Sequence, residues 1–573
     1  MQNDEIANAF DEIGDLLELQ GANTFRVRAY RNAARTLRDL SDSIADLVAD
    51  PKFDLDELPG IGKDLAGKIR TLVTTGSIPQ LDELRAVVPP GVAEMLRIPG
   101  LGPKKVATLF KEHGIDSLAS LKKAALAGEI AGIKGFGKKT EQTILANIDQ
   151  AAEAAQRTLF AVAAESVEPV IRHLRARDVV SHVEAAGSYR RRLETVGDLD
   201  VIAAATDAEA VMDALAAQSL VEAVLSRGPT KMRVRLRTGL ELDLRVLEEA
   251  SYGAGLVYFT GSKAHNIVLR RRGQQRGLKV NEYGVFRGEK SIAGRSEEDV
   301  YAALELPWIP PELREDRGEF DLAESGTLPT LVTTDDIRGD LHMHTTASDG
   351  TATIAEMALA AKALGRKYIA ITDHSKRVSM ARGLDSKRLR EHWKEIDRVN
   401  GEIQGIEILK GIECDILEDA TMDLPDDVLA EADWVIAVLH YGLKQPRERI
   451  MKRLVAAVRH PYVDAIGHPS GRLIGRRKGA DIDYTALFKA AAEHGVLVEI
   501  NANPQRLDLD DVQAHAAKKH GLKIVIDTDA HSTEGLEMTQ YGIHQARRAG
   551  LEAKDVANTR TLAQFRKLLV KRL

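Results

Sequence analysis

Length, composition and charge narrow the class of this protein before any motif is considered. The chain has 573 residues, and domains average roughly 150 residues, so about four domains are expected and one small fold is excluded. The single cysteine, Cys414, excludes an internal disulfide and a thiolate zinc cage and indicates a reducing compartment. The start MQNDEIANAF is acidic where a signal peptide would be basic, and no apolar run approaches the roughly 20 residues that cross a bilayer, so we expect a cytoplasmic protein that does not contact a membrane.

Charge is unevenly distributed along the chain. The net charge of -7 argues against a generally basic surface. Residues 97–139 nevertheless carry 9 basic and 3 acidic side chains, and residues 256–295 carry 9 and 2, which gives local charges of +6 and +7. These two basic segments could hold a polyanion such as nucleic acid, although solvated lysine faces would give the same count.

Residues 1 to about 150 read as short amphipathic helices separated by glycine-rich turns. The pattern apolar-(Pro/Lys)-Gly-apolar-Gly occurs three times, as LPGIG at 58–62, IPGLG at 98–102 and IKGFG at 133–137, each followed by a lysine within three residues. Such a turn leads into a helix whose free N–H groups can bind phosphate. Single Gly-x-Gly turns are common connectors, but three in one region favour binding of a phosphate backbone.

These turns resemble helix-hairpin-helix motifs, which grip DNA without reading its sequence. The resemblance implies DNA contacts at the six glycines Gly60, Gly62, Gly100, Gly102, Gly135 and Gly137.

From about 155 to 305 helices alternate with strand-like runs, which predicts an α+β region. Asp198 and Asp200 are two residues apart on a predicted strand and share a face, and Asp243 lies on a second strand that could pair alongside at roughly 4.8 Å. At about 4 Å and an effective dielectric near 20, each like-charge pair costs on the order of 4 kcal/mol, so convergence implies bound cations or raised pKa values. Two Mg²⁺ ions there would suit phosphoryl transfer.

Surface aspartates at strand ends are the alternative interpretation of this pattern. The nearby Gly187-Ser188 turn and Arg191 favour the metal site instead, because they supply N–H, hydroxyl and guanidinium donors of the kind a triphosphate needs.

Residues 1 to about 305 resemble DNA polymerase family X, the polymerase beta-like repair enzymes. The motifs occur in order: LPGIG and IPGLG, GSYRR with GDLD, LDLR, YFTGSKAHN and VNEYG. The resemblance implies that Asp198 and Asp200 hold both metals and that Asp243 joins at the ion that activates the primer 3'-hydroxyl. It further implies nucleotide contacts from Arg157, Gly187, Ser188, Arg191, Tyr258, Phe259, Gly261 and Asn266, with Arg270, Glu282 and Tyr283 beside the template. A packed aromatic turn remains the alternative for YFTGSKAHN.

Two positions depart from that family. Lys68 falls where those enzymes place the Schiff-base lysine that removes a 5'-deoxyribose phosphate, but the supporting basic position four residues earlier is Asp64. We therefore expect a helix-surface lysine rather than a lyase. Glu241 replaces an arginine two residues before Asp243, so the third carboxylate must be oriented from elsewhere.

The proline-rich and charged stretch at 306–337 predicts a linker. Beyond it, a strand-then-helix pattern repeats seven times, which predicts a parallel, barrel-like sheet with its chemistry at the carboxyl ends of the strands. Of 16 histidines, 12 lie beyond residue 340. Six of the seven predicted strands end in a residue that can bind a metal, from the set His342, His344, His374, Glu413, His440, His468, Asp529 and His531. Imidazole and carboxylate without thiolate suit a Zn²⁺, Mn²⁺ or Fe cluster that hydrolyses phosphodiesters.

These motifs resemble the PHP domain, named for polymerases and histidinol phosphatase. The resemblance adds Asp349 to that ligand set, implies a site for three ions, of Mn²⁺ or Zn²⁺, and makes Glu413 a bridging ligand. Arg377, Arg382 and Arg472 follow strand ends and could receive phosphate, although surface arginines are the simpler interpretation.

Together these features predict a multidomain protein with an all-α helix-hairpin-helix region, an α+β nucleotidyltransferase palm with a thumb, and a C-terminal α/β distorted (β/α)7 barrel. The expected ranges are 1–85 and 86–155 for two helical DNA-binding parts, 156–245 for the palm, 246–305 for the nucleotide-selecting thumb, 306–337 for the linker and 338–573 for the phosphoesterase.

The predicted function is short-gap or base-excision repair by a DNA polymerase with a 3'-5' exonuclease. By family analogy the barrel also cuts at abasic sites or removes a 3'-phosphate. Gapped or primer-template DNA and deoxynucleoside triphosphates are the expected partners, and a monomer is expected. A phosphatase acting on a small monoester, as in histidinol-phosphate hydrolysis, and a DNA-binding scaffold with an inactive polymerase half are the alternatives.

Overall fold

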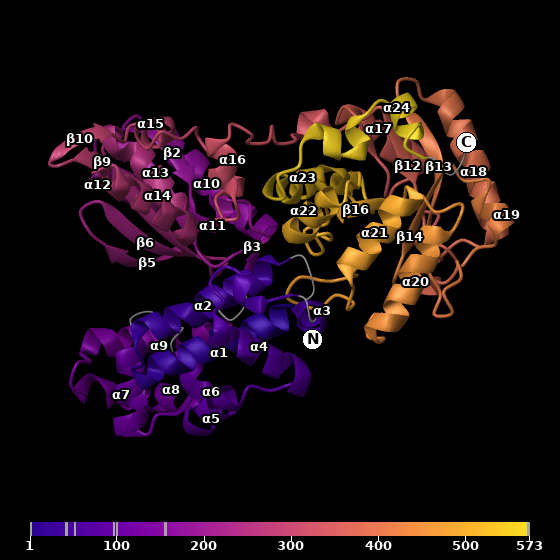
Figure 1. Ribbon diagram of the computed structural model, residues 1–573. Helices are drawn as coiled ribbons and strands as arrows, with labels where there is room; N and C mark the ends of the chain where they lie inside the picture. The colour runs from indigo at the N-terminus through magenta and orange to yellow at the C-terminus, as the bar shows by residue number, and fades with distance from the viewer. Residues whose placement is uncertain are drawn as a thin grey trace. The chain divides into compact units, whose positions relative to one another are not determined.

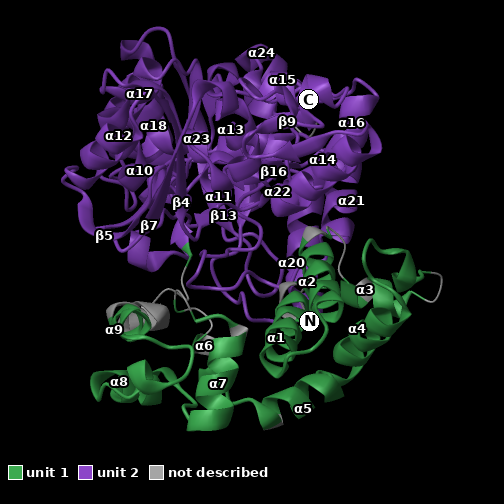
Figure 2. Ribbon diagram, turned by 90° about the vertical axis from the view of Figure 1, so that its left-hand side faces the viewer, with its two compact units in different colours: residues 1–157 green, residues 158–573 purple. Residues whose placement is uncertain are grey.

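The structure, a computed structural model, describes residues 3–40, 44–50, 53–95, 98, 101–153 and 157–569. The chain divides into two compact units, residues 1–157 and 158–573 (Figure 2). No helix among the described residues is both long and apolar enough to span a membrane.

The first unit, here called the helical unit, contains no strand among its described residues. Apolar residues recur three or four positions apart, so each helix buries one face; α1 (Asn3–Gln20) buries Ile6, Phe10, Ile13 and Leu17 in this way. The remaining helices are α2 (Thr24–Asp39), α3 (Ile44–Ala49), α4 (Lys63–Thr75), α5 (Pro79–Val87), α6 (Pro90–Met95), α7 (Pro103–His113), α8 (Leu118–Leu126) and α9 (Lys138–Glu153).

Each glycine turn leads directly into a helix, as the sequence predicts. Residues 58–62 precede α4, residues 98–102 precede α7 and residues 133–137 precede α9. The same backbone bond recurs in all three turns, from Ile61 N to Leu58 O at 3.0 Å, from Leu101 N to Ile98 O at 3.0 Å and from Phe136 N to Ile133 O at 2.9 Å. The described residues of the three segments therefore share the same turn-closing bond.

The second unit begins with a five-stranded sheet, here called the central sheet, in the order β2-β4-β7-β6-β5. On one face of the sheet, Val201 and Ala203 pack against two helices, α10 (Phe160–Arg175) and α12 (Ala208–Ala216). On the other face, Ile202 and Ala204 pack against a third helix, α13 (Tyr252–Thr260). Alternation along β4 thus places Asp200 on the face opposite the first two helices. The elements of this region are β1 (Thr158–Leu159), α10 (Phe160–Arg175), β2 (Val180–Ala185), α11 (Gly187–Arg190), β3 (Thr195–Val196), β4 (Leu199–Ala205), α12 (Ala208–Ala216), β5 (Val221–Arg227), β6 (Lys231–Leu236) and β7 (Glu241–Leu247).

A smaller lobe follows the central sheet and has its own apolar core around Val257, Leu269 and Tyr301. It carries a three-stranded antiparallel sheet in the order β10-β9-β8. Its elements are α13 (Tyr252–Thr260), α14 (Lys263–Gln275), β8 (Lys279–Asn281), β9 (Gly284–Arg287), β10 (Lys290–Ala293) and α15 (Glu297–Ala303).

Residues 306–337, expected to form a linker, are folded against both of their neighbours. Leu306, Ile309 and Phe320 belong to the core of the smaller lobe, whereas Val332 and Ile337 belong to the core that follows. The segment contains α16 (Glu319–Glu324) and short 3-10 turns. Its prolines and charges suggested a solvated connector, but its scattered apolar residues are buried because two packed bodies lie on either side.

The C-terminal region forms a parallel seven-stranded sheet, here called the barrel, whose strands follow one another in chain order from β11 to β17. The predicted strand-helix alternation is confirmed, and the helices lie outside the strands (Figure 1). The strands are β11 (Gly339–Asp340), β12 (Tyr368–Ile371), β13 (Glu407–Asp415), β14 (Trp434–Val438), β15 (Ala465–Ile466), β16 (Leu497–Asn501) and β17 (Ile524–Asp527). The helices are α17 (Ile354–Ala363), α18 (Ser386–Glu402), α19 (Asp426–Leu429), α20 (Arg447–Arg459), α21 (Tyr484–His494), α22 (Asp511–Lys519), α23 (Thr539–Arg548) and α24 (Leu562–Arg566).

Large aromatic side chains fill the inside of the barrel away from the carboxyl ends of its strands. Tyr368, Trp434 and Phe565 belong to one core, with the ring of Phe565 5.6 Å from Tyr368 and 5.5 Å from Trp434. Alternate residues such as Val435 pack instead against the outer helices. Because that part of the interior is apolar, polar side chains gather at the carboxyl ends of the strands.

Candidate active sites

Two groups of charged side chains stand out in the second unit. The first lies on the central sheet, where β4 and β7 are parallel neighbours and Asp200 is directly opposite Asp243. Asp198 immediately precedes β4 and shares the face of Asp200. The three carboxylates expected to meet are therefore brought together.

Crowding of these carboxylates is visible in the pKa of Asp200. Burial and the neighbouring charges of Asp198 and Asp243 raise this pKa from 3.8 to about 7, although Arg245 and Arg191 lower it in part. Like charges held close together in a partly buried place favour either a proton or a cation. The site is therefore suited to bind a divalent ion.

The turn that follows β2 approaches Asp200 very closely. Gly187 has a φ of +60°, and a Cβ atom at this position would stand 2.4 Å from Asp200 Oδ2. Any other residue would displace the carboxylate, so glycine is required here by the approach of the turn. Ser188 and Arg191 are thereby held beside the carboxylates.

Arg233 orients the third carboxylate, that of Asp243, which Glu241, itself an anion, cannot do. It lies on β6 opposite Asp243, its Nε donates to Asp243 Oδ1 at 2.9 Å and its Nη2 to Oδ2 at 2.5 Å. Its Nη1 also reaches Glu241 at 3.4 Å. Sequence reasoning missed this residue, although a hairpin centred on Thr238 would have aligned positions 233 and 243.

Arg191 joins the central sheet to the smaller lobe. Its Nη1 donates to Thr260 O at 2.5 Å, and a Cβ atom on Gly261 would stand 3.3 Å from the same nitrogen. Tyr258 and Phe259 lie edge to face 5.1 Å apart in the same segment. Arg191 therefore contacts the segment of the smaller lobe that carries the other predicted nucleotide contacts. Arg157, a further predicted nucleotide contact, is the exposed last residue of the helical unit.

Asn266 and the predicted template contacts lie on the smaller lobe. Asn266 Nδ2 donates to Tyr258 O at 2.7 Å, and these two residues line one recess together with Arg270. Glu282 and Tyr283 occupy the turn between β8 and β9, where Tyr283 is 56% exposed. An aromatic ring that is this exposed is available for contact with a base.

Asp200→Asn is expected to raise the thermal midpoint of unfolding of the metal-free protein at pH 8 but not at pH 4. The pKa of Asp200 is 3.8 in the unfolded chain and about 7 in the folded protein. Between these two pH values the folded state keeps a proton on Asp200 that the unfolded state has lost, so the free energy of unfolding falls as pH rises through this window. The difference between the two pKa values of Asp200 corresponds to at most about 4 kcal/mol in the free energy of unfolding. Thermal melts in EDTA at both pH values measure the change in midpoint, with the exposed Asp178→Asn as the control. An equal change at pH 8 and pH 4 would contradict the prediction.

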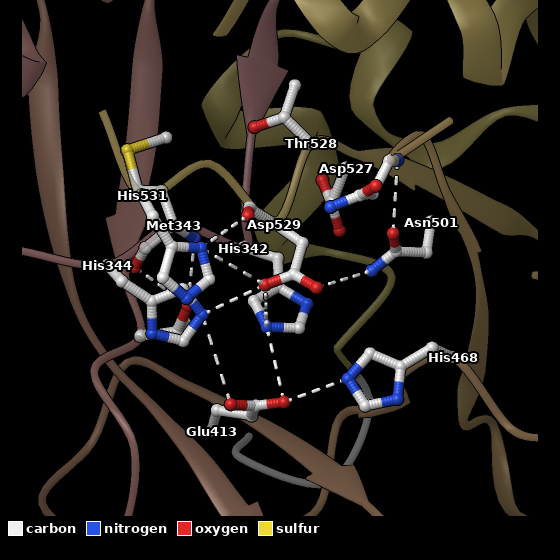
Figure 3. Close-up of polar contacts among 12 residues, drawn as sticks. His342, Met343, His344, Glu413, His468, Asn501, Asp527, Thr528, Asp529 and His531 are labelled. Carbon is white, nitrogen blue, oxygen red and sulfur yellow. Dashed lines mark hydrogen bonds and ion pairs between the residues drawn. The ribbon is translucent and has the colours of Figure 1, made fainter. Parts of the chain in front are cut away.

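The second group of charged side chains lies at the carboxyl ends of the barrel strands (Figure 3). The loop after β11 carries His342, His344 and Asp349, His374 follows β12, and Glu413 lies within β13, two residues before its end. The loops after β14, β15 and β17 carry His440, then His468, then Asp529 and His531. They form four overlapping groups in which ligand atoms lie within 4.8 Å of one another: His344, Asp349, His374 and His531; His342, Glu413 and His468; His342, His344 and Asp529; and His374, Glu413 and His440. All nine residues of the predicted ligand set are thus brought together.

Glu413 is the centre of this cluster. Its Oε1 lies 2.9 Å from His468 Nε2 and 3.4 Å from both His342 Nε2 and His440 Nε2, and its Oε2 contacts His374 Nδ1. One carboxylate that reaches four imidazoles has the geometry of a bridging ligand.

Asp349 joins the cluster from the loop after β11. Its Oδ1 lies 3.4 Å from His374 Nε2 and 3.5 Å from His531 Nε2, and hydrogen bonds from these two imidazoles outweigh burial and lower its pKa. Burial lowers the pKa of His374, but the carboxylates of Glu413 and Asp349 raise it to about 10. Metal binding to such a site would release protons.

Carboxylates behind the cluster fix the orientation of two imidazoles. Glu499 accepts from His342 Nδ1 at 2.7 Å, and Asp415 accepts from His440 Nδ1 at 3.0 Å. The Nε2 lone pairs therefore point into the cluster, where His342 Nε2 is buried and has no hydrogen-bond partner among the described residues. Such an orphaned nitrogen, 3.6 Å from Asp529 Oδ1, fits a divalent cation between the two groups.

The first strand of the barrel is shorter than predicted, and this positions its histidines. The sequence GDLHMH at 339–344 predicts one longer strand, but β11 ends at Asp340. Beyond Asp340, the backbone N–H groups of Leu341 and Met343 bond to side chains instead of to the backbone of a neighbouring strand. Leu341 N donates to Asp527 Oδ1 at 2.8 Å, and Met343 N donates to Thr372 Oγ1 at 3.0 Å.

Glu499→Gln is expected to weaken metal binding about 10- to 100-fold, because the amide no longer holds the His342 tautomer as a carboxylate does. Metal content after dialysis against graded chelator measures the change. The exposed Glu493→Gln on α21 is the matched control and should retain the metal content of the unchanged protein. Equal metal retention by both variants would contradict a role for Glu499.

Known protein families match the helical unit and the second unit separately. The chain matches family models described as helix-hairpin-helix domain (residues 1–78), SAM-like helix-hairpin-helix tandem (92–149), DNA polymerase beta thumb (255–315) and PHP domain (340–503). It is 40% identical over 566 residues to the DNA polymerase/3'-5' exonuclease PolX of Bacillus subtilis, covering 98% of each chain. The chain belongs to the family X DNA polymerases that carry a PHP domain.

A part of the chain is also similar to a second class of proteins. It is 32% identical over 231 residues to a protein of Thermoanaerobacter sp. named a probable phosphatase, covering 38% of this chain and 89% of that one. A protein of Aliivibrio fischeri with the same kind of name is 30% identical over 210 residues, covering 35% and 80%.

The helix-hairpin-helix glycines of this family X chain have space around them. A Cβ atom at Gly62, Gly102, Gly135 or Gly137 would meet no atom within 4 Å, and one at Gly60 would meet only Asn32, at 3.8 Å. Packing within the chain therefore gives no reason for the absence of a side chain. Gly100 lies outside the described residues.

Lys68 has an environment unlike that of a Schiff-base lysine. Its Nζ forms an ion pair with Asp64 and lies 5.4 Å from the centre of the Tyr30 ring. Burial lowers its pKa, but hydrogen bonds with Asp64 and Tyr30 outweigh burial and raise it. A raised pKa keeps the amine protonated, which opposes nucleophilic attack.

Proposed function

We propose that this chain fills short gaps in DNA with its central sheet and hydrolyses DNA from the 3' end with its barrel. The observation that carries the proposal is the convergence of two separate cation-binding groups in one unit, one of three carboxylates and one of imidazoles around Glu413. Membership of family X with a PHP domain agrees with both activities, since the Bacillus subtilis relative is named for both.

At the central sheet, Asp198, Asp200 and Asp243 would hold two Mg²⁺ ions. Ions bound there would supply positive charge that favours ionisation of the primer 3'-hydroxyl and neutralises the triphosphate. Arg233 would keep Asp243 aligned, while the Gly187-Ser188 turn and Arg191 would bind phosphate oxygens.

The incoming nucleotide and the template would also meet the smaller lobe. Tyr258, Phe259 and Gly261 would line the sugar and Asn266 would meet the base edge, with Arg157 as a further phosphate contact. Arg270, Glu282 and Tyr283 would lie beside the template. The glycine turns before α4, α7 and α9 would bind DNA backbone through N–H groups at the helix starts, where the described glycines leave space for a phosphate.

At the barrel, the nine-residue ligand set would hold Mn²⁺ or Zn²⁺, with three ions as the proposed number and Glu413 as the bridge. Bound ions would supply Lewis-acid charge to a phosphodiester. Glu499 and Asp415 would hold the imidazoles of His342 and His440 in the tautomer whose Nε2 binds a metal. Removal of a 3'-phosphate or cleavage at abasic sites would use the same ions.

The proposal includes three finer expectations. Substrates are gapped or primer-template DNA with deoxynucleoside triphosphates, the enzyme is a monomer, and it works in the cytoplasm, where both substrates occur. No lyase activity is assigned to Lys68, because its ion pair with Asp64 favours the protonated amine. The ranges 1–85, 86–155, 156–245, 246–305 and 338–573 remain the proposed functional parts.

Similarity of part of the chain to proteins named as probable phosphatases favours one second candidate, hydrolysis of a small phosphate monoester. A metal-loaded sample should be given a duplex with a one-nucleotide gap, with and without nucleotides, and then a small monoester as competitor. The proposal expects extension with nucleotides, 3' shortening without them, and little competition. Hydrolysis of the monoester with no change in the DNA would favour the second candidate, and DNA binding without either reaction would favour a scaffold.

A further inference from the structure

The segment Gly187–Glu194, here called the phosphate turn because it carries Ser188 and Arg191, is closed by its own backbone. Leu193 N donates to Ser188 O at 3.1 Å, and Phe160 N donates to Glu194 O at 2.9 Å. These bonds fix the shape of the turn but leave its side chains to be held from elsewhere.

Arg548 of the barrel contacts the phosphate turn directly. It is the last residue of α23, and its side chain is 5% exposed. Its Nη1 donates to Arg191 O at 2.8 Å and to Glu315 Oε1 at 3.0 Å, and its Nη2 lies 2.8 Å from Asp511 Oδ2. Three contacts on one planar guanidinium determine its orientation.

Glu315 connects Arg548 to the side chain of Arg191. The same oxygen, Oε1, accepts from Arg191 Nε at 3.0 Å. Burial raises the pKa of Glu315, but Arg548 and Arg191 outweigh burial and lower it, so the carboxylate is charged. With Nη1 of Arg191 bound to Thr260 O, no partner among the described residues engages its Nη2, the nitrogen left to bind phosphate.

Arg472 holds the other end of the phosphate turn. Its Nη2 donates to Glu194 Oε2 at 2.6 Å and to Leu507 O at 2.6 Å, and its Nε donates to Arg506 O at 2.8 Å. Arg472 comes four residues after His468, so one barrel loop carries both a candidate metal ligand and this contact. The expectation of a surface arginine does not describe this position, because the side chain is 20% exposed.

Aromatic rings make a third connection. Tyr189 of the phosphate turn stacks on Phe160 with ring centres 4.6 Å apart and planes 7° apart. The edge of the same Phe160 ring meets His544 of α23 at 5.0 Å and 72°. The barrel therefore supports the turn near its beginning, middle and end.

We propose that Arg548 and Arg472, two side chains of the barrel, are positioning residues for nucleotide binding at the central sheet. The inference deepens the proposed polymerase function and rests on it. Donors that are held in place before a ligand arrives lose less freedom on binding, so loss of either arginine should weaken nucleotide binding rather than the chemical step. Neither arginine touches the nucleotide: Arg548 acts through Arg191 and Glu315, and Arg472 acts through Glu194.

The test uses the full chain in single-nucleotide gap filling with four proteins: unchanged, Arg548→Lys, Arg472→Gln and Arg547→Ala. Arg547 is the matched control, since it is the neighbouring arginine of α23 and binds Glu312 at 2.7 Å and Val332 O at 3.2 Å without touching the phosphate turn. We expect KM for the nucleotide to rise about tenfold in the first two variants, with kcat within about threefold. We expect Arg547→Ala to retain the KM of the unchanged protein.

Circular dichroism and a thermal melt show which variants are folded, because the loop that carries Arg472 also carries the candidate metal ligand His468 and digestion is not an independent measure of folding. If Arg548→Lys does not fold, Arg472→Gln decides the question alone. An unchanged nucleotide KM in the folded variants overturns the inference, as does an equal rise in Arg547→Ala, which would indicate general loosening of the contact. Absence of incorporation by the unchanged protein would instead contradict the proposed polymerase function.

Discussion

Asp243→Asn is expected to lower single-nucleotide gap filling by at least about a hundredfold while 3' digestion stays within about twofold. Asp243 lies opposite Asp200 on the neighbouring strand, and its two oxygens are aligned by Arg233. The amide keeps the shape of the side chain but loses the charge that a second cation requires. Steady-state incorporation into a gapped duplex measures the loss.

Glu241→Gln is the matched control for this experiment. Glu241 lies two residues earlier on β7, on the same face, and also contacts Arg233, at 3.4 Å. Loss of its charge should leave gap filling within about threefold. Equal activity in Asp243→Asn and the unchanged protein would remove the carboxylate group from the proposed mechanism.

Glu413→Gln is expected to abolish 3' digestion, by at least about a hundredfold, with a fall in bound metal and unchanged gap filling. Glu413 contacts His342, His374, His440 and His468, so a single substitution affects two of the ligand groups that share it. A neutral amide leaves these imidazoles without the anion that holds a shared cation. Metal analysis and a 3'-labelled single strand measure the two effects.

Glu407→Gln controls for a change on the same strand. Glu407 begins β13, its side chain is 49% exposed and it pairs with Arg566 at 2.7 Å, far along the strand from Glu413. It should retain both metal and digestion. Full digestion by Glu413→Gln, or loss of gap filling together with digestion, would contradict the assignment of two independent sites.

Local patterns predicted the elements of both sites well. The spacing of Asp198 and Asp200 predicted that both side chains share one face, because side chains alternate along an extended chain; Asp200 lies on β4 and Asp198 just before it. The seven strand-like runs after Arg338 became β11 to β17 in chain order, since a right-handed parallel crossover leaves few other arrangements. Glu413 and the histidines met because the carboxyl ends of parallel strands lie at one edge.

Other features depended on which strands and loops became neighbours. Arg233 could be assigned to Asp243 only once β6 and β7 paired in register. Glu499 lies within β16, on a run that reads as purely structural, and its role depends on a hydrogen bond to His342, 157 positions earlier. The apolar residues of 306–337 looked sparse in sequence, and two packed bodies buried them.

The sequence by itself determined the periodicity of each element, the charges it carries and the order of the motifs, because these follow from local geometry and residue type. Only the tertiary structure decided that Arg548 and Arg472 of the barrel reach the phosphate turn, 357 and 278 positions away from their partners. Contacts at such separation depend on how whole elements pack, and many pairings of charged residues are compatible with one sequence until packing selects among them.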